Sequence, residues 1–209
     1  MYKRIHASME KMMTTTQLEM EIETRNKVHE LIAHRWSPRA FKTDMIPDEE
    51  LFSLFEAARW AASSMNEQPW RFIYARKGEG AYDKIVASLM DGNKPWAKEA
   101  SVLIATVVKT TFARNNNPNG SAIHDLGLAV GNMSLQATSL GIGVHQIGGF
   151  HRDMIREQFD LPTDYAPVTV LALGYFGDAD QLPDGLRERE RAIRTRKPLE
   201  EIAFHGTFK

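Results

Sequence analysis

Two arginine clusters are the residues best suited to binding chemistry in this sequence. One is Arg35-Trp36-Ser37-Pro38-Arg39, and the other, far along the chain, is Arg194-Thr195-Arg196. Guanidinium groups bind phosphate through paired hydrogen bonds and stay charged at any working pH. In an extended chain, residues i and i+2 project to the same side, so each cluster can present two cations together. We expect a phosphate-binding site, although either cluster taken alone is more typical of solvated surface.

A polar loop and a glycine pair are two further candidates. Residues 62–70 read ASSMNEQPW, and their hydroxyl and amide groups suit the carbonyls, ring nitrogens and hydroxyls of a ligand such as a flavin. Residues 146–150, QIGGF, could bring a backbone N–H close to a planar ligand, because glycine has no Cβ. Ordinary turn formation is the alternative explanation for both segments.

Several other kinds of chemistry are excluded or disfavoured. The chain has no Cys, so thiol nucleophiles, thiolate zinc sites, iron–sulfur ligation and disulfides are impossible. It also lacks a G-x-G-x-x-G dinucleotide fingerprint and a G-x-x-x-x-G-K-[ST] phosphate loop. The spacing of His124, His145 and His151 matches no recognised metal site, so no metal is predicted.

The composition is that of an ordinary globular chain. Its 209 residues carry 26 Lys and Arg against 27 Asp and Glu, a net charge of −1, and 43% are hydrophobic. A chain with this balance does not attract DNA, so we expect no nucleic-acid partner. No apolar run reaches the roughly 18 residues of a membrane-spanning helix, and the first residues do not form a signal peptide. We therefore expect a cytoplasmic protein without a membrane partner.

Hydrophobic periodicity places the helices and strands. Residues 1–22 are predicted to form a polar, Met-rich leader that is flexible or depends on a partner, and residues 23–209 a single domain. Helices are predicted over Thr24–Ala33, Tyr82–Met90, Ser121–Leu140 and Asp153–Phe159. Another helix is predicted to begin near Asp48, and its apolar face consists of Leu51, Phe52, Phe55, Ala58 and Ala62. Strands are predicted over Trp70–Ala75, Val102–Val108, Val144–Ile147 and Val168–Leu173, with a turn over Asp91–Pro95. Because helices and strands do not alternate regularly, the predicted class is α+β.

Two local patterns carry predictions of their own. Gly127 and Gly131 lie four residues apart in a predicted helix, and small residues there would let another helix or a ligand approach closely. Leu186–Lys197 is rich in arginine and glutamate and is typical of an exposed helix.

Taken together, the motifs resemble the flavin-dependent nitroreductase family. Their order along the chain is R-x-S-x-R, SSxNxQPW, IGGF, LGY and R-x-R-x-PLEE, and the resemblance covers about residues 27–203. It implies a nitroreductase-like fold, with a central, mostly antiparallel sheet flanked by helices, in an intertwined homodimer. It also implies two FMN sites at the subunit interface, reduced by NADH or NADPH in a ping-pong cycle.

The resemblance also assigns roles to particular residues. Arg35, Ser37, Arg194 and Arg196 match positions that hold the FMN phosphate and ribityl chain, and Arg39 matches a cation near flavin N1 and O2. Such a cation would stabilise the anionic reduced flavin. Residues that match the loop offered by the other subunit are Ser63, Ser64, Asn66 and Gln68. Ile147, Gly148 and Gly149 form the segment whose backbone faces flavin N5 and O4, and Asn93 matches a ring-edge amide by its distance from the strand at Val102.

Departures from the family pattern are few. Trp36 replaces a commonly smaller or polar residue, Ala62 stands where proline is frequent, and Arg194 stands where lysine is common. Trp36 is predicted to pack beside the cofactor or to fill the core or an interface. The stretch between Lys109 and Gly120 lies where relatives vary in covering the flavin, so it would help to set substrate choice.

The expected reaction is hydride transfer from the nicotinamide to flavin N5, followed by electron delivery to a nitroaromatic or quinone. Because the cofactor performs the chemistry, no catalytic side chain is named. The alternatives are a specialised relative that fragments flavin, removes halogen or oxidises azolines, and a flavin-binding protein without turnover. A dimeric interaction protein without any ligand is the remaining alternative.

Overall fold

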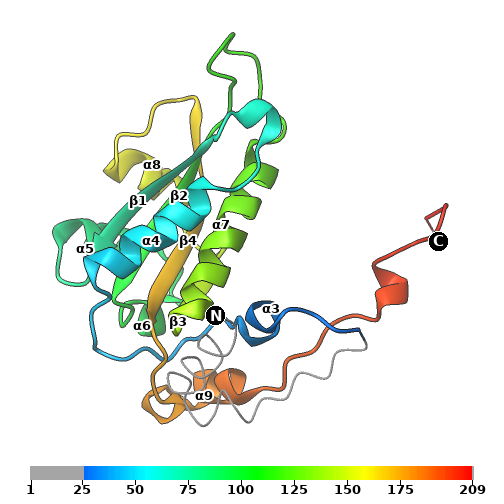
Figure 1. The fold of residues 1–209 in the computed structure, drawn as a ribbon. Coiled ribbons are helices and arrows are strands. Elements are labelled where there is room, and N and C mark those ends of the chain that lie inside the picture. Colours follow the sequence, from blue (N-terminus) through cyan, green and yellow to red (C-terminus); the bar gives the residue numbers. More distant parts are fainter. Residues whose placement is uncertain (1–25, 209) are drawn as a thin grey trace.

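The computed structural model describes residues 26–208, and Figure 1 shows how their helices and strands are arranged. The helices are α3 (Glu30–His34), α4 (Asp48–Arg59), α5 (Gly80–Ser88), α6 (Lys94–Ala97), α7 (Ala122–Ser139), α8 (Arg152–Gln158) and α9 (Asp184–Arg191). Short 3-10 helices are η1 (Ser64–Asn66), η2 (Ala179–Gln181) and η3 (Leu199–Glu201). The strands are β1 (Trp70–Arg76), β2 (Val102–Lys109), β3 (Ile142–Ile147) and β4 (Tyr165–Tyr175). The predicted α+β class is confirmed.

The four strands form one antiparallel sheet in the order β1-β2-β4-β3. Its register places Lys109 of β2 opposite Tyr165, at the start of β4, and Ile142 of β3 opposite Tyr175, at the end of β4. The sheet therefore has two distinct ends, separated by the length of β4. At about 3.3 Å per residue, the eleven residues of β4 span about 36 Å.

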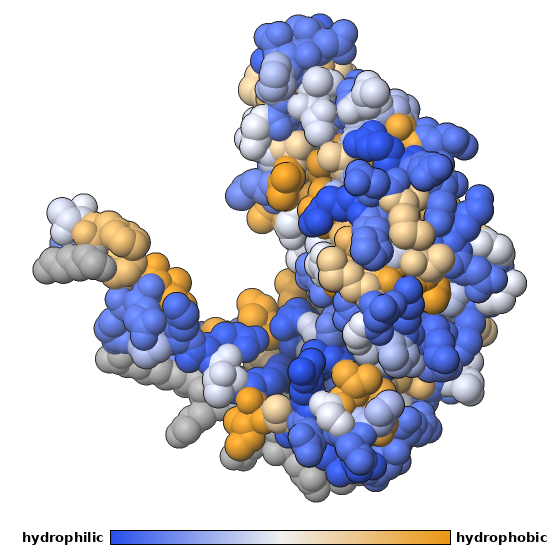
Figure 2. All heavy atoms as spheres, turned by 180° about the vertical axis from the view of Figure 1, so that it is seen from behind, coloured by the Kyte–Doolittle hydropathy of each residue, from blue (hydrophilic) through white to orange (hydrophobic). Residues whose placement is uncertain are grey.

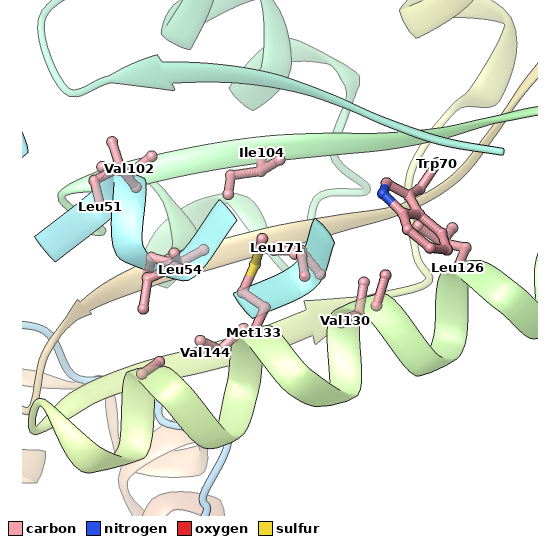
Figure 3. Packing of buried hydrophobic residues seen from close by; sticks show 14 of the residues in the cluster. Leu51, Leu54, Trp70, Val102, Ile104, Leu126, Val130, Met133, Val144 and Leu171 are labelled. Carbon is pink, nitrogen blue, oxygen red and sulfur yellow. The ribbon is translucent and has the colours of Figure 1, made fainter. Parts of the chain in front are cut away.

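One face of the sheet packs against α4 and α7, and Figure 3 shows this layer from close by. Side chains alternate along a strand, so Val102 and Ile104 of β2 both point to this face. They meet Leu54 of α4 and Met133 of α7, which are fully buried. Burying one such side chain stabilises the fold by about 1.5–3 kcal/mol.

The opposite face of the sheet packs against α5, α6 and α8. The intervening residues of β2, Leu103 and Ala105, point to this side and join Ile85, Trp96 and Ile155 in a second core. Because both faces are covered, seven of the eight residues of β2 are buried. This burial confirms the prediction of a fully buried strand and explains its continuous apolar sequence.

Several sequence predictions need correction at the N-terminal side. The helix predicted from Thr24 is limited to the five residues of α3, and Thr24 lies outside the described residues. In α4, Leu51, Leu54 and Ala58 face the core, whereas Phe52 is 52% exposed. Ala62 is exposed because α4 ends at Arg59. The predicted turn at 91–95 is shorter, because Lys94 and Pro95 already begin α6.

Predictions for α7 and the C-terminal segment also need correction. Gly127 and Gly131 were expected to permit a close approach, yet both are exposed and an added Cβ would meet nothing within 4 Å. They lie away from the packed face formed by Leu126, Val130 and Met133. The helix predicted over 186–197 is α9, which ends at Arg191, so residues 192–197 are extended.

The segment after α9 extends away from the body of the molecule, and Figure 2 shows a hollow between the two. It exposes large apolar side chains, which are Ile193, Leu199, Ile202, Phe204 and Phe208. The predicted leader, residues 1–22, lies outside the described residues. Among residues 26–208, no helix is both long enough and apolar enough to cross a membrane.

Gly143 of β3 fixes where the first arginine cluster lies. A Cβ on Gly143 would lie 2.9 Å from Pro38 Cδ and closer still to Pro38 Cγ, so the segment carrying Arg35 and Arg39 rests directly on the sheet. We predict that Gly143→Ala lowers the free energy of unfolding by about 1–3 kcal/mol, because overpacking strains its neighbours. Urea denaturation measures the loss. Gly80→Ala is the matched control, since an added Cβ there meets nothing; equal unfolding midpoints for the two variants would contradict the prediction.

Candidate functional site

The structure brings the two arginine clusters together at the end of the sheet where β4 finishes. The backbone oxygen of Arg35 accepts a hydrogen bond from Arg194 Nη1 at 3.0 Å, although the two residues are 159 positions apart. Arg35 Nη1 in turn donates to Ser37 Oγ at 3.1 Å. Four of the predicted residues, Arg35, Ser37, Arg194 and Arg196, therefore belong to one group, which we call the arginine cluster.

Like charges face one another in the arginine cluster. Burial lowers the pKa of Arg35, and the charge of Arg196 lowers it further. Burial also lowers the pKa of Arg194, as do the charges of Arg196 and Arg35. No ion pair within residues 26–208 joins any of the three to a carboxylate. Arg194 Nε is buried and has no hydrogen-bond partner among residues 26–208. A group of partly desolvated cations with an unpaired donor is suited to an anionic ligand.

Trp36 supports this cluster from the side. Its ring lies under the Arg194 guanidinium, with Arg194 Cζ 5.9 Å from the ring centroid. A cation over an aromatic face is stabilised by the ring quadrupole. Trp36 was predicted to pack beside the cofactor or to fill the core or an interface. Its observed contact is with Arg194, a predicted phosphate-binding residue, and its side chain is only partly buried.

Arg39 lies next to the cluster and is held by two different contacts. Its guanidinium Nη1 is 3.8 Å from Glu190 Oε2, and its Cζ lies 5.9 Å from the centroid of the Trp96 ring. Its backbone N–H donates to both oxygens of Glu190, at 2.9 and 3.0 Å. Glu190 therefore fixes both the backbone and the charge of Arg39.

His145 of β3 holds the same segment from below. Its Nδ1 lies 2.9 Å from the carbonyl oxygen of Pro38, and its ring packs against Trp96 with centroids 4.4 Å apart. A carbonyl only accepts, so Nδ1 carries the proton and donates. Burial lowers the pKa of His145 to about 4, and the charge of Arg39 acts in the same direction. His145 is therefore neutral near pH 7 and has the structural role that its spacing favoured.

Asn93, which lies three residues before Trp96, contacts the glycine pair. Asn93 Nδ2 donates to the backbone oxygen of Gly149 at 3.0 Å. An added Cβ on Gly149 would lie 2.8 Å from that same nitrogen, so glycine is required for the contact. Gly148 is exposed and has open space around its Cα, whereas the Ile147 side chain belongs to the core. The Ile147 side chain therefore cannot face a ligand, because it is part of the core.

The polar loop 63–68 is folded on itself by hydrogen bonds. Gln68 N donates to Ser63 Oγ at 3.0 Å, and Gln68 Nε2 donates to the backbone and side-chain oxygens of Asn66 at 3.1 Å. The N–H of Ser64 donates to the buried carboxylate of Asp125 in α7. Met65, Asn66 and Gln68 all have positive φ, a conformation that stores strain and often accompanies function.

This loop lies at the other end of the sheet from the arginine cluster. It precedes Trp70, which pairs with Val108 near the end of β2, while Phe41 bridges to Phe176 beyond the end of β4. Figure 1 shows the two regions at opposite ends of the molecule. The loop also contacts the hairpin 110–119, because Ala113 N donates to Glu67 Oε1 at 2.6 Å. Within one chain, the predicted site residues therefore form two groups that lie far apart.

Two residues of the site escaped the sequence prediction. Glu190 is buried although it stands in the charged run RERER, which is typical of exposed helix. Trp96 of α6 contacts both Arg39 and His145. The one feature of the sequence that could have identified it is its position three residues after Asn93. Within residues 26–208, no group of three His, Cys, Asp or Glu side chains could hold a metal ion.

Comparison with known proteins identifies relatives of this chain. Residues 32–175 match the model of the Nitroreductase family. A candidate NADH dehydrogenase/NAD(P)H nitroreductase of Archaeoglobus fulgidus is 30% identical over 149 residues, covering 69% of this chain and 83% of that protein. The FMN reductase (NADPH) of Bacillus subtilis is 26% identical, covering 72% of this chain and 66% of that protein.

A solved structure extends the similarity to nearly the whole chain. The crystal structure of an oxidoreductase containing FMN superposes with a TM-score of 0.86 and 36% sequence identity, covering 94% of this chain and 99% of that one. The family match, the shared fold and the order of the motifs agree. The chain belongs to the nitroreductase family.

Proposed function

We propose that this protein is an FMN-dependent NAD(P)H oxidoreductase. The observation that carries the proposal is the arginine cluster, in which Arg35, Arg194 and Arg196 repel one another and Arg194 Nε is buried without a partner. A phosphate group would supply the missing anion and accept several charge-assisted hydrogen bonds. The structural neighbour, which is described as containing FMN, supports the same cofactor, and the name of the Bacillus subtilis relative, FMN reductase (NADPH), supports flavin reduction by a nicotinamide nucleotide.

The residues present fit this cofactor along its whole length. Arg35, Ser37, Arg194 and Arg196 would hold the phosphate and ribityl chain, and Arg39 would lie near N1 and O2 of the ring. The exposed backbone of Gly148 and the Asn93–Gly149 pair would face the ring edge. When bound, FMN supplies the capacity to accept hydride from NADH or NADPH and to pass electrons to an acceptor.

In this proposal, the side chains of the protein bind and orient the cofactor and do not themselves take part in the reaction. Arg39 places a fixed positive charge where a reduced flavin would be negative, which favours the reduced form. His145, neutral near pH 7, holds the backbone beside Arg39 instead of transferring a proton. We propose that donor and acceptor use the same exposed side in turn, as in a ping-pong cycle, and that the acceptors are nitroaromatics or quinones.

We further propose that the active form is an intertwined homodimer. The segment after α9 exposes Ile193 (89%), Ile202 (60%) and Phe208 (89%) while extending away from its own body. The outer face of α7 exposes Ile123 (64%) beside Gly127 and Gly131. A second copy could cover both surfaces, and its 63–68 loop could complete the site that the arginine cluster begins. The close approach expected at the two glycines would then occur between subunits.

The phosphate assignment predicts a large loss of affinity when two arginines are removed. Each charge-assisted contact is worth about 1.5–3 kcal/mol, so Arg194→Ala with Arg196→Ala should raise the FMN dissociation constant at least a hundredfold. Fluorescence titration of FMN measures the change. The matched control is Arg187→Ala with Arg189→Ala, which removes the same charge from α9. Equal FMN affinity in the two double variants would refute the phosphate site.

The shared-site proposal predicts complementation between two defective chains. One chain carries Arg194→Ala with Arg196→Ala. The other carries Ser64→Ala with Asn66→Asp, where Asp tolerates the positive φ of Asn66. Differently tagged chains are coexpressed and the mixed dimer is purified through both tags. It should bind one FMN with wild-type affinity, because one of its two sites is intact, while each homodimer binds weakly. A mixed dimer as weak as both homodimers, or a monomer that retains FMN, would contradict a shared site.

A further inference from the structure

Glu190 is a buried carboxylate in the last turn of α9. Its residue is 7% exposed, whereas Glu188 and Arg189 on the same helix are exposed. Charged side chains are seldom buried unless they are paired and hydrogen-bonded, because removal from water is costly. The position of Glu190 therefore needs partners strong enough to hold it.

Those partners are Arg39, the last residue of the first arginine motif, and Ala40, which follows it. Glu190 Oε1 accepts from Arg39 N at 2.9 Å and from Ala40 N at 3.2 Å, while Oε2 accepts from Arg39 N at 3.0 Å. Oε2 also lies 3.8 Å from Arg39 Nη1. One carboxylate thus satisfies two consecutive backbone donors and faces one cation.

These contacts connect α9 with the segment around Arg39, beside the arginine cluster. Arg194, which follows α9, adds two further contacts with this segment, because its Nη1 donates to the backbone oxygen of Arg35 and its Cζ lies 5.9 Å from the centroid of the Trp36 ring. Glu190 precedes Arg194 by four residues and Arg196 by six, so it anchors the end of α9 just before the segment that carries both arginines. Without Glu190, the segment carrying Arg194 and Arg196 would lose its charged contact with Arg39 while the repulsion among Arg35, Arg194 and Arg196 remained.

Glu190 also supplies negative charge at this end of the sheet. Burial raises its pKa, while the N–H groups of Arg39 and Ala40 and the charge of Arg39 lower it. As an anion, it offsets part of the positive charge that Arg39 presents to its surroundings.

We infer that Glu190 is the positioning residue of the cofactor site, fixing Arg39 and aligning the two arginine-bearing segments around one anion. The inference rests on the proposed FMN site. It assigns no contact between Glu190 and the cofactor, because both carboxylate oxygens are engaged by Arg39 and Ala40.

A purely structural role makes a different prediction from a positioning role. If Glu190 only stabilised the fold, its loss would weaken FMN and riboflavin equally, since the two ligands share the ring and the ribityl chain. If Glu190 aligns the arginine cluster, its loss reduces the preference for FMN, because only FMN carries the phosphate. The ratio of the two dissociation constants therefore separates the roles.

The test uses the full-length protein with Glu190→Ala, Glu190→Gln and the exposed control Glu188→Gln. Titration with FMN and with riboflavin should show that Glu190→Ala reduces the preference for FMN at least tenfold. Glu190→Gln keeps an acceptor for the backbone N–H groups but removes the charge that offsets Arg39. It should favour binding of reduced over oxidised FMN by about tenfold, a rise of about 30 mV in the potential of bound FMN. Glu188→Gln should match wild type in both measurements.

Failure of the inference and failure of the proposed function give different results. Wild-type protein that binds neither ligand would refute the FMN site itself. Wild-type protein that binds FMN, with an unchanged FMN preference in Glu190→Ala and an unchanged potential in Glu190→Gln, would overturn only the role of Glu190. Should Glu190→Ala fail to fold, the potential of Glu190→Gln decides alone.

Discussion

Mutual repulsion among arginines is the constraint on which the site depends. Burial and the charge of Arg196 lower the pKa of Arg35, burial and the charges of Arg196 and Arg35 lower the pKa of Arg194, and no carboxylate within the described residues forms an ion pair with any of the three arginines. The protein stabilises this arrangement through neutral or indirect contacts: the Arg35 carbonyl, the Ser37 hydroxyl and the Trp36 ring. Direct pairing with acidic side chains would stabilise the apoprotein more but would compete with an anionic ligand. Uncompensated charge is therefore the feature that most directly connects the fold with the proposed function.

The sheet supplies the rigidity that this arrangement needs. Pro38 rests on Gly143 of β3, its carbonyl accepts from His145, and Phe41 bridges to Phe176 after β4. Trp96 of α6 packs against His145 and Arg39, and α6 begins one residue after Asn93. A continuous series of packed side chains thus links the phosphate end of the proposed site to the ring end. The polar loop 63–68 is anchored separately, by Asp125 of α7, which suits a role in a neighbouring subunit.

Sequence reasoning succeeds where the signal is local and fails where it depends on distant contacts. The apolar run of β2 and the regular spacing of α7 identify a strand and a helix without tertiary information. Asn93 could be selected by counting back from the strand at Val102, and its side chain contacts Gly149, whereas its role at a flavin ring edge stays a prediction. Glu190 could not, because RERER is typical of exposed helix and its partner, Arg39, lies 151 positions earlier. Within residues 26–208 nothing approaches Gly127 or Gly131, and their spacing alone does not tell whether an approaching helix would belong to the same molecule or to another.

The most direct test of the account is the visible absorption spectrum of the full-length protein after incubation with FMN and desalting. The spectrum is followed without oxygen while NADPH or NADH is added in separate titrations. We predict that flavin bands remain after desalting and that at least one nucleotide bleaches them. A colourless protein would contradict the assignment of the arginine cluster as a phosphate site. Flavin that is retained but bleached by neither nucleotide would contradict the proposed oxidoreductase activity.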